Sequence, residues 1–139
     1  MITYFDTSAA MKLLVAEEGS VVAIALWDEA AVVLGSRLLY PELRAALGRA
    51  HRAGRITAAK LAEAKEILVD RMADVDIVEV DERLALAAGE LAERLRLRAY
   101  DAVHLASALQ VDGTTLATWD GDLIRAAAAT GLPVATSRS

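Results

Sequence analysis

Short, continuous apolar runs recur along the chain, separated by longer segments in which polar residues return at helical spacing. A continuous apolar run is typical of a strand that is buried on both faces, as in a parallel sheet. We therefore expect strands at residues 2–5, 31–34, 77–80 and 114–119, with a last short one at 134–135.

The segments between these runs are predicted to be helices. Leu84, Leu91 and Leu95 form one apolar stripe, whereas residues 99–109 are apolar nearly all round, which indicates a buried helix. Pro41 suits the first turn of a helix. The expected helices span residues 7–16, 20–29, 41–54, 57–72, 81–96, 99–109 and 121–129.

Strands separated by helices predict an α/β fold with helices on both faces of a central parallel sheet. The 139 residues are an ordinary length for one domain, and no repeat or linker interrupts them. We expect a single domain over residues 1–139.

Composition then narrows the function classes. The chain has no cysteine, which excludes a disulfide framework, a thiolate zinc site and a thiol nucleophile. No apolar run reaches the roughly 18 residues of a membrane span, and the first residues lack the pattern of a signal peptide. We therefore expect a cytoplasmic protein with no membrane partner.

The charge distribution matters more than the net charge. A net charge of −5 argues against a nucleic-acid partner. Within residues 37–60, however, six basic residues stand against Glu42 alone, which makes this stretch +5. Such a stretch is either a surface for phosphate contacts or simply a solvated helix face, and charge alone does not decide between the two.

Four acidic residues stand at the starts of predicted helices. Asp6 and Asp120 directly follow strands, while Glu42 and Asp101 lie in the first turns of their helices. Each position has a purely structural explanation, because a carboxylate there caps free N–H groups and suits the helix dipole. Asp101 fits that explanation least well, because its neighbours are apolar and a buried carboxylate needs a partner.

The joint arrangement of these acids favours a metal site. In an open parallel sheet the carboxyl ends of the strands share one edge, so Asp6 and Asp120 converge if their strands are neighbours. Clustered carboxylates repel, and a divalent cation removes that repulsion. An all-oxygen set suits Mg²⁺ or Mn²⁺, and one or two such ions can support phosphodiester hydrolysis by water.

His104 lies one turn after Asp101 and is able to contact this site. The alternative, which we favour from the sequence, is a core or surface histidine whose hydrogen bonds are satisfied locally. No other nucleophile is required for the hydrolysis proposed.

Four segments, in order along the chain, resemble the PIN domain and most closely the VapC-type toxins of toxin–antitoxin pairs. They are YFDTSA at 4–9, YPELRAAL at 40–47, YDAVHLASAL at 100–109 and ATWDGDL at 117–123. This resemblance implies a PIN-like three-layer sandwich with a central parallel sheet of about five strands. It also implies a Mg²⁺- or Mn²⁺-dependent endoribonuclease. If water activated by the metal attacks the phosphorus, as we expect, the products carry a 5′-phosphate and a 3′-hydroxyl.

The resemblance assigns roles to individual residues. It makes Asp6, Glu42, Asp101 and Asp120 the catalytic, metal-binding acids. Supporting positions near the metal are Ser8, Thr118 and, as a variable extra acid, Asp122. Candidate RNA-binding residues are Arg44, Arg49, Arg52 and Arg98. The family further implies a homodimer and an antitoxin protein as partner.

Two other folds that begin with a strand and an aspartate fit poorly. A haloacid-dehalogenase phosphatase needs a second aspartate where Ser8 stands, and a receiver domain needs a late lysine that is absent after Lys65. The serious alternative is a non-catalytic PIN module that acts as a protein- or RNA-binding scaffold.

Overall fold

The computed structural model describes residues 1–135, which fold around one parallel sheet. The strands are β1 (Ile2–Phe5), β2 (Val32–Ser36), β3 (Val75–Val78) and β4 (Thr114–Ala117). The helices are α1 (Thr7–Leu14), α2 (Ser20–Glu29), α3 (Leu39–Arg52), α4 (Ala58–Met72), α5 (Glu82–Leu95), α6 (Ala99–Leu109) and α7 (Gly121–Thr130).

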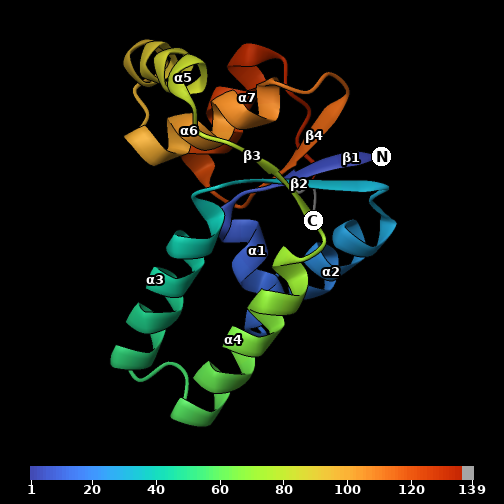
Figure 1. The fold of residues 1–139 in the computed structure, drawn as a ribbon, viewed down its shortest axis with the longest axis vertical. Helices are drawn as coiled ribbons and strands as arrows, with labels where there is room; N and C mark the ends of the chain where they lie inside the picture. The colour runs from blue at the N-terminus through green and yellow to red at the C-terminus, as the bar shows by residue number, and fades with distance from the viewer. Residues whose placement is uncertain (136–139) are drawn as a thin grey trace.

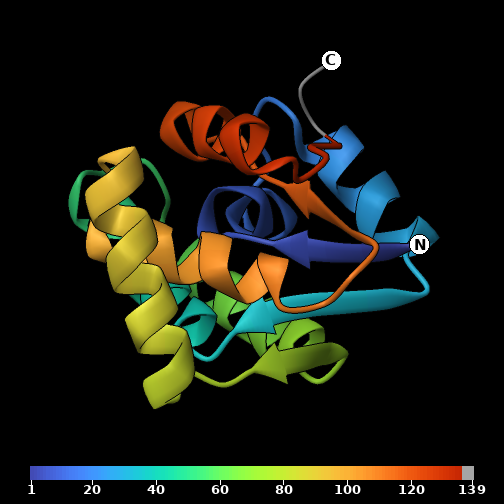
Figure 2. The same ribbon diagram turned by 90° about the horizontal axis from the view of Figure 1, so that it is seen from above.

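The strand order is β3-β2-β1-β4, and every neighbouring pair runs parallel. Helices cover both faces, with α5, α6 and α7 on one side and α1 to α4 on the other (Figures 1 and 2). The α/β sandwich expected from the sequence is therefore confirmed. The expected run at 134–135 is reduced to an isolated bridge, in which Val134 pairs in parallel with Leu116.

Alternation along β1 directs neighbouring side chains into different cores. Tyr4 joins a cluster built with α5, α6 and α7, whereas Phe5 packs with Trp27 in a cluster built with α1 and α2. A third cluster joins α1, α3 and α4. In Figure 1, α3 and α4 extend away from the sheet as an antiparallel pair, so α3 is held largely by other helices.

Several boundaries differ from the sequence expectation. The fourth strand ends at Ala117 and not at residue 119, the second runs to Ser36 and not to residue 34, and the first helix ends at Leu14 and not at residue 16. Two further differences have identifiable reasons. The third strand is Val75–Val78 and not 77–80. It is an edge strand, so the exposed face tolerates Asp76 in the middle of the run. Helix α3 begins at Leu39, which leaves Pro41 within the first turn, where its missing N–H costs no helical hydrogen bond.

None of the helices within residues 1–135 is long and apolar enough to cross a membrane. The single domain expected over 1–139 extends four residues past this described part.

Candidate metal and RNA site

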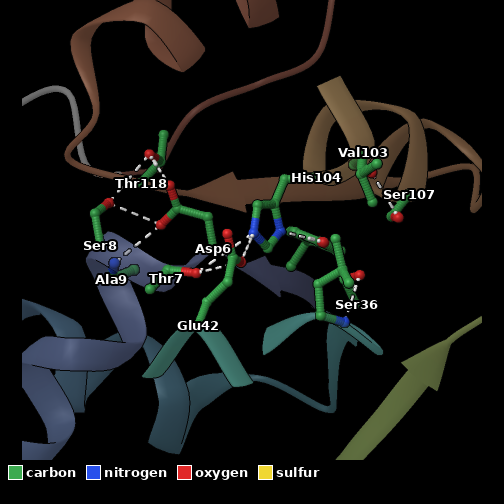
Figure 3. A network of polar contacts seen from close by, with 12 residues as sticks. Asp6, Thr7, Ser8, Ala9, Ser36, Glu42, Val103, His104, Ser107 and Thr118 are labelled. Carbon is green, nitrogen blue, oxygen red and sulfur yellow. Dashed lines mark hydrogen bonds and ion pairs between the residues drawn. The ribbon is translucent and has the colours of Figure 1, made fainter. Parts of the chain in front are cut away.

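The site lies at the carboxyl ends of the two neighbouring strands β1 and β4. Phe5 pairs with Ala117, and the amide N–H of Asp6 donates to the Ala117 carbonyl at 3.3 Å. The condition set by the sequence, that the first and fourth strands be neighbours, is met. Asp6 and Thr118 consequently lie side by side although they are far apart along the chain (Figure 3).

Both carboxylate oxygens of Asp6 are held by hydrogen bonds. Oδ1 accepts from Ser8 Oγ at 2.8 Å and from the Ala9 amide at 2.9 Å, and Oδ2 accepts from Thr118 Oγ1 at 2.5 Å (Figure 3). Burial raises the pKa of Asp6, and the nearby His104 and these hydrogen bonds oppose that rise. Asp6 is thus a fixed, buried acid, and Ser8 and Thr118 are its direct supports.

Asp120 caps α7 in the same way that Asp6 caps α1. Its Oδ1 accepts from the amides of Asp122 and Leu123, at 2.8 and 3.2 Å. The two junctions are joined by Ser8, whose Oγ accepts from the Trp119 amide at 2.9 Å. The capping explanation is therefore correct for Asp6 and Asp120. The same capping hydrogen bonds hold both carboxylates at one edge of the sheet.

Asp101 differs from the other acids because no hydrogen bond stabilises it. It lies in the first turn of α6 with only 7% of its surface exposed, and within residues 1–135 its carboxylate accepts no hydrogen bond. Burial, followed by the negative charge of Asp120, raises the pKa of Asp101 to about 6, although His104 opposes the rise. The Asp101 residue is largely buried, but its carboxylate opens onto the cleft, where a bound cation would remove the repulsion from Asp120.

Glu42 reaches the site from α3 and is bound through one oxygen. Its Oε1 lies 2.7 Å from Thr7 Oγ1 and 2.6 Å from His104 Nε2 (Figure 3). Burial alone would raise the pKa of Glu42, but the hydrogen bond and charge of His104, with the Thr7 hydroxyl, outweigh burial and hold that pKa below its usual value. Glu42 is therefore an ionised, half-buried acid.

His104 connects this acid to the centre of the sheet. Its Nδ1 lies 2.7 Å from the Tyr4 hydroxyl, and its ring is 2% exposed. Tyr4 is fully buried on β1, and this burial raises the pKa of its phenol, which keeps the hydroxyl protonated. The sequence favoured a locally satisfied histidine. His104 is satisfied, and its partners are Tyr4, the site carboxylate of Glu42 and, at 3.4 Å, the Thr7 hydroxyl.

These side chains line an open cleft of about 370 Å³. All four acids contribute to its wall, together with Arg49 and Tyr100. Arg49 makes no ion pair within residues 1–135, so its guanidinium is available to an anion.

The other candidate RNA-binding residues lie outside the cleft wall. Arg98 is linked to it by donating to the Tyr100 hydroxyl at 3.1 Å. Arg44 donates to Tyr40, and both Arg44 and Arg52 are exposed. Asp122 is exposed as well and pairs with Arg125 at 3.4 Å, outside the lining of the cleft.

The donor set fits Mg²⁺ or Mn²⁺ in kind, because it consists of carboxylate oxygens with free lone pairs on Asp101 and Glu42. Within residues 1–135, however, no three acidic or histidine side chains are already grouped closely enough to hold an ion. Cation binding would therefore have to draw the carboxylates together.

The sequence interpretation missed three residues of this site, namely Tyr4, Thr7 and Tyr100. A signal existed for Tyr4, because a tyrosine in a strand buried on both faces needs a partner for its hydroxyl. The sequence offers no comparable signal for Thr7 or Tyr100, since their roles depend on which helix lies opposite.

The comparisons with known proteins agree with this architecture. Two relatives from Mycobacterium tuberculosis, Ribonuclease VapC45 and Ribonuclease VapC49, are each 45% identical over 139 residues, which covers 99% of this chain and 96% of theirs. The crystal structure of Mycobacterium tuberculosis VapC20, a sarcin-ricin loop cleaving toxin, matches with 22% identity and a TM-score of 0.72, covering 96% of this chain and 98% of that one.

A toxin–antitoxin complex from Klebsiella pneumoniae matches with 21% identity and a TM-score of 0.59, over 85% of this chain and 86% of that one. These solved structures support the fold. The model of the PIN domain matches residues 3–129, which is nearly the whole length. The resemblance inferred from the four sequence segments is thereby confirmed, and the chain belongs to the PIN-domain family.

Proposed function

We propose that this protein is a metal-dependent endoribonuclease and the toxin of a VapBC-type toxin–antitoxin pair. The observation that carries the proposal is Asp101, whose carboxylate opens onto the cleft without a hydrogen-bond donor within residues 1–135 and shares that cleft with three further acids. The relatives at 45% identity are named ribonucleases, which supports RNA as the substrate.

In this proposal Asp6, Glu42, Asp101 and Asp120 hold the cation. Bound Mg²⁺ or Mn²⁺ would supply a Lewis acid that activates water and stabilises the leaving oxygen of the phosphodiester. Ser8 and Thr118 keep Asp6 fixed through their hydroxyls, so that its lone pairs point to one place. The depressed pKa of Glu42 keeps that acid ionised well below neutral pH.

Arg49 supplies positive charge at a wall that is otherwise acidic. A phosphate of the RNA backbone would meet strong repulsion from four carboxylates, and a guanidinium in the cleft offsets this repulsion. Tyr100 is a second candidate contact for RNA, because it is 44% exposed and offers an aromatic ring on which a base can stack. Arg98 donates a hydrogen bond to its hydroxyl. Arg44 and Arg52 would contribute only to RNA that extends beyond the cleft.

An antitoxin protein as partner is part of the same proposal, because one solved structure of the same fold is a toxin–antitoxin complex. A homodimer is proposed from the resemblance alone.

The test is cleavage of end-labelled RNA with and without Mn²⁺. Asp6→Asn and Asp101→Asn should each lower the rate by more than the 10- to 100-fold that loss of an outer-shell partner usually costs. Asp70→Asn is the matched control, because Asp70 is an exposed helical aspartate of α4. Products should carry a 5′-phosphate and a 3′-hydroxyl.

A 2′,3′-cyclic phosphate would rule out attack by water. RNA binding without any Mn²⁺-dependent cleavage would instead favour the non-catalytic scaffold.

A further inference from the structure

Glu42 is the one site acid whose position is set by side chains from other elements alone. Asp6 and Asp120 are each fixed by backbone amides of the helices they cap. Glu42, by contrast, lies on α3, which packs against α1 and α4 and projects away from the sheet (Figure 1). Its hydrogen bonds to the rest of the molecule run through Thr7 of α1 and His104 of α6.

The His104 ring is held at both nitrogens. Nε2 faces the Glu42 carboxylate at 2.6 Å and Nδ1 faces the Tyr4 hydroxyl at 2.7 Å. An ionised carboxylate only accepts, so Nε2 carries a proton. Nδ1 then accepts from the Tyr4 hydroxyl in a neutral imidazole and donates to it in an imidazolium, so the contact holds in either state. The two rings also meet edge to face, with centroids 5.8 Å apart and planes 72° apart.

The anchor of this chain of contacts is rigid. Tyr4 is fully buried in β1, which lies between β2 and β4 in the sheet. Its hydroxyl therefore sets the ring plane of His104, and the ring sets the position of Glu42 Oε1. Thr7 Oγ1 also binds Oε1, so that this oxygen is fully occupied. Oε2 makes no hydrogen bond within residues 1–135 and is left for the cleft that Glu42 lines.

We propose that His104, oriented by Tyr4, is a positioning residue that fixes the Glu42 carboxylate so that only its second oxygen is presented to the cleft. The role in catalysis rests on the proposed ribonuclease function, whereas the positioning itself does not. A histidine that merely fills the core would need its hydrogen bonds satisfied, but it would not link Tyr4 to Glu42 energetically.

The first experiment needs no metal. Tyr4 and Glu42 share no hydrogen bond, and the charge of Glu42 acts directly on Tyr4 by disfavouring the ionised phenol, which is not formed at neutral pH. Tyr4→Phe and Glu42→Ala should therefore act independently on unfolding unless His104 couples them. The unfolding equilibrium constant of each variant in a double-mutant cycle is measured by urea denaturation. For the double variant, we expect the change in this constant to differ at least threefold from the product of the changes in the two single variants. Agreement with that product within about twofold would overturn the positioning role.

A second cycle provides the control. Tyr4→Phe combined with Asp120→Asn pairs the same hydroxyl with an acid that shares no hydrogen bond with His104 within residues 1–135. The effects of these two substitutions on the unfolding equilibrium constant should multiply to within about twofold. Tyr4→Phe removes only a hydroxyl from a buried ring, so this variant is expected to fold.

The second experiment separates two replacements of His104 by geometry. The amide nitrogen of His104→Gln reaches the place of Nε2 and retains the donor to Glu42. That of His104→Asn reaches only the place of Nδ1 and loses this donor. The affinity for Mn²⁺, measured by calorimetry, should fall 10- to 100-fold in His104→Asn and stay within about threefold in His104→Gln. A merely structural histidine would give no such rescue by glutamine.

The two proposals fail in different ways. If the wild type binds Mn²⁺ and both His104 variants and Tyr4→Phe bind it equally well, the positioning role is overturned and the ribonuclease proposal stands. If the wild type binds no Mn²⁺, the metal site fails, and the metal-free coupling between Tyr4 and Glu42 still decides for or against positioning.

Discussion

At the scale of single residues, Asp6 and Asp101 show how hydrogen bonding makes two acids of the same site behave differently. Both are buried, but Asp6 accepts three hydrogen bonds whereas Asp101 accepts none within residues 1–135. Burial and the negative charge of Asp120 therefore make the ionised form of Asp101 a cost to the cation-free fold, which His104 reduces. An acid whose ionised form is destabilised in this way is typical of a binding site, because a bound cation removes the destabilisation.

This cost gives a pH dependence whose sign can be derived. An unfolded Asp101 loses its proton near pH 3.8, whereas the folded one keeps it to about pH 6. Between these values the unfolded state binds fewer protons, so stability falls as pH rises, and above pH 6 the penalty is constant. Because the carboxylate opens onto the cleft, water screens part of this penalty, so we expect Asp101→Asn to raise stability at pH 7 by at most about 2 kcal/mol and to change it little at pH 4.

Urea unfolding at the two pH values measures this difference directly. Asp70→Asn serves as the control for loss of one negative charge, because Asp70 is exposed in a helix. If Asp101→Asn destabilises the protein at pH 7, or stabilises it equally at both pH values, then desolvation is not what determines the behaviour of this acid.

At the scale of elements, α3 carries both signs of charge to the cleft. Glu42 and Arg49 are two turns apart on one face of this helix, and both line the cleft. The acid is anchored by His104, while Arg49 makes no ion pair within the described residues. The helix thus combines a carboxylate held in place with a guanidinium that has no ion-pair partner within residues 1–135. This combination suits an RNA backbone that enters a site lined by carboxylates.

Arg49→Ala should therefore weaken RNA binding and leave the chemical step nearly unchanged. In an Asp101→Asn background that cannot cleave, the slope of log affinity against log salt should become shallower by about 0.7, the value of one phosphate contact on a single strand. In the active protein KM should rise more than kcat falls.

With an RNA short enough to lie within the cleft, Arg44→Ala is the matched control, because it removes the same charge from the same helix outside the cleft. Equal effects of the two substitutions would mean that net charge, and not a contact in the cleft, governs RNA binding.

Most of the elements could be predicted from the sequence because their causes are local. That the four acids line one cleft depends on β1 and β4 being neighbours, which the sequence stated only as a condition, and their role as metal ligands stays a prediction. Apolar runs, caps and Pro41 act within a few residues. Placing β3 two residues too late has a different cause, since only the edge position of this strand explains why Asp76 is tolerated. The partnership of His104 with Tyr4 and Glu42 was equally out of reach, because it depends on three elements packing together.

At the scale of the whole molecule, the strand order explains how distant residues form one site. β1 lies between β2 and β4, so the acid that follows the first strand meets the acid that precedes the last helix. Asp101 and Glu42 join them from helices on opposite faces of the sheet (Figure 1). Any ligand bound by all four acids would therefore tie together both ends of the chain and both helical layers.

We accordingly expect Mn²⁺ to stabilise the entire fold and not one segment of it. A ligand that binds only the native state adds about 2.7 kcal/mol at a hundredfold excess over Kd, which for a domain of this size is a rise of roughly 9 °C in Tm. Melting should stay a single transition, because the bound ion links β1, α3, α6 and the β4–α7 junction.

Calorimetric melting with Mn²⁺, against sodium salt at equal ionic strength, measures this shift. Asp101→Asn should lose most of the Mn²⁺-dependent rise even though its own Tm at pH 7 is higher, whereas Asp70→Asn should retain the full rise. A higher Tm without Mn²⁺, combined with a smaller rise on adding Mn²⁺, identifies an acid of the metal site. Replacing a structural aspartate would instead lower the Tm without Mn²⁺ and leave the Mn²⁺-dependent rise unchanged. An unshifted Tm at millimolar Mn²⁺ in the wild type would mean that the carboxylates do not assemble around a cation without RNA.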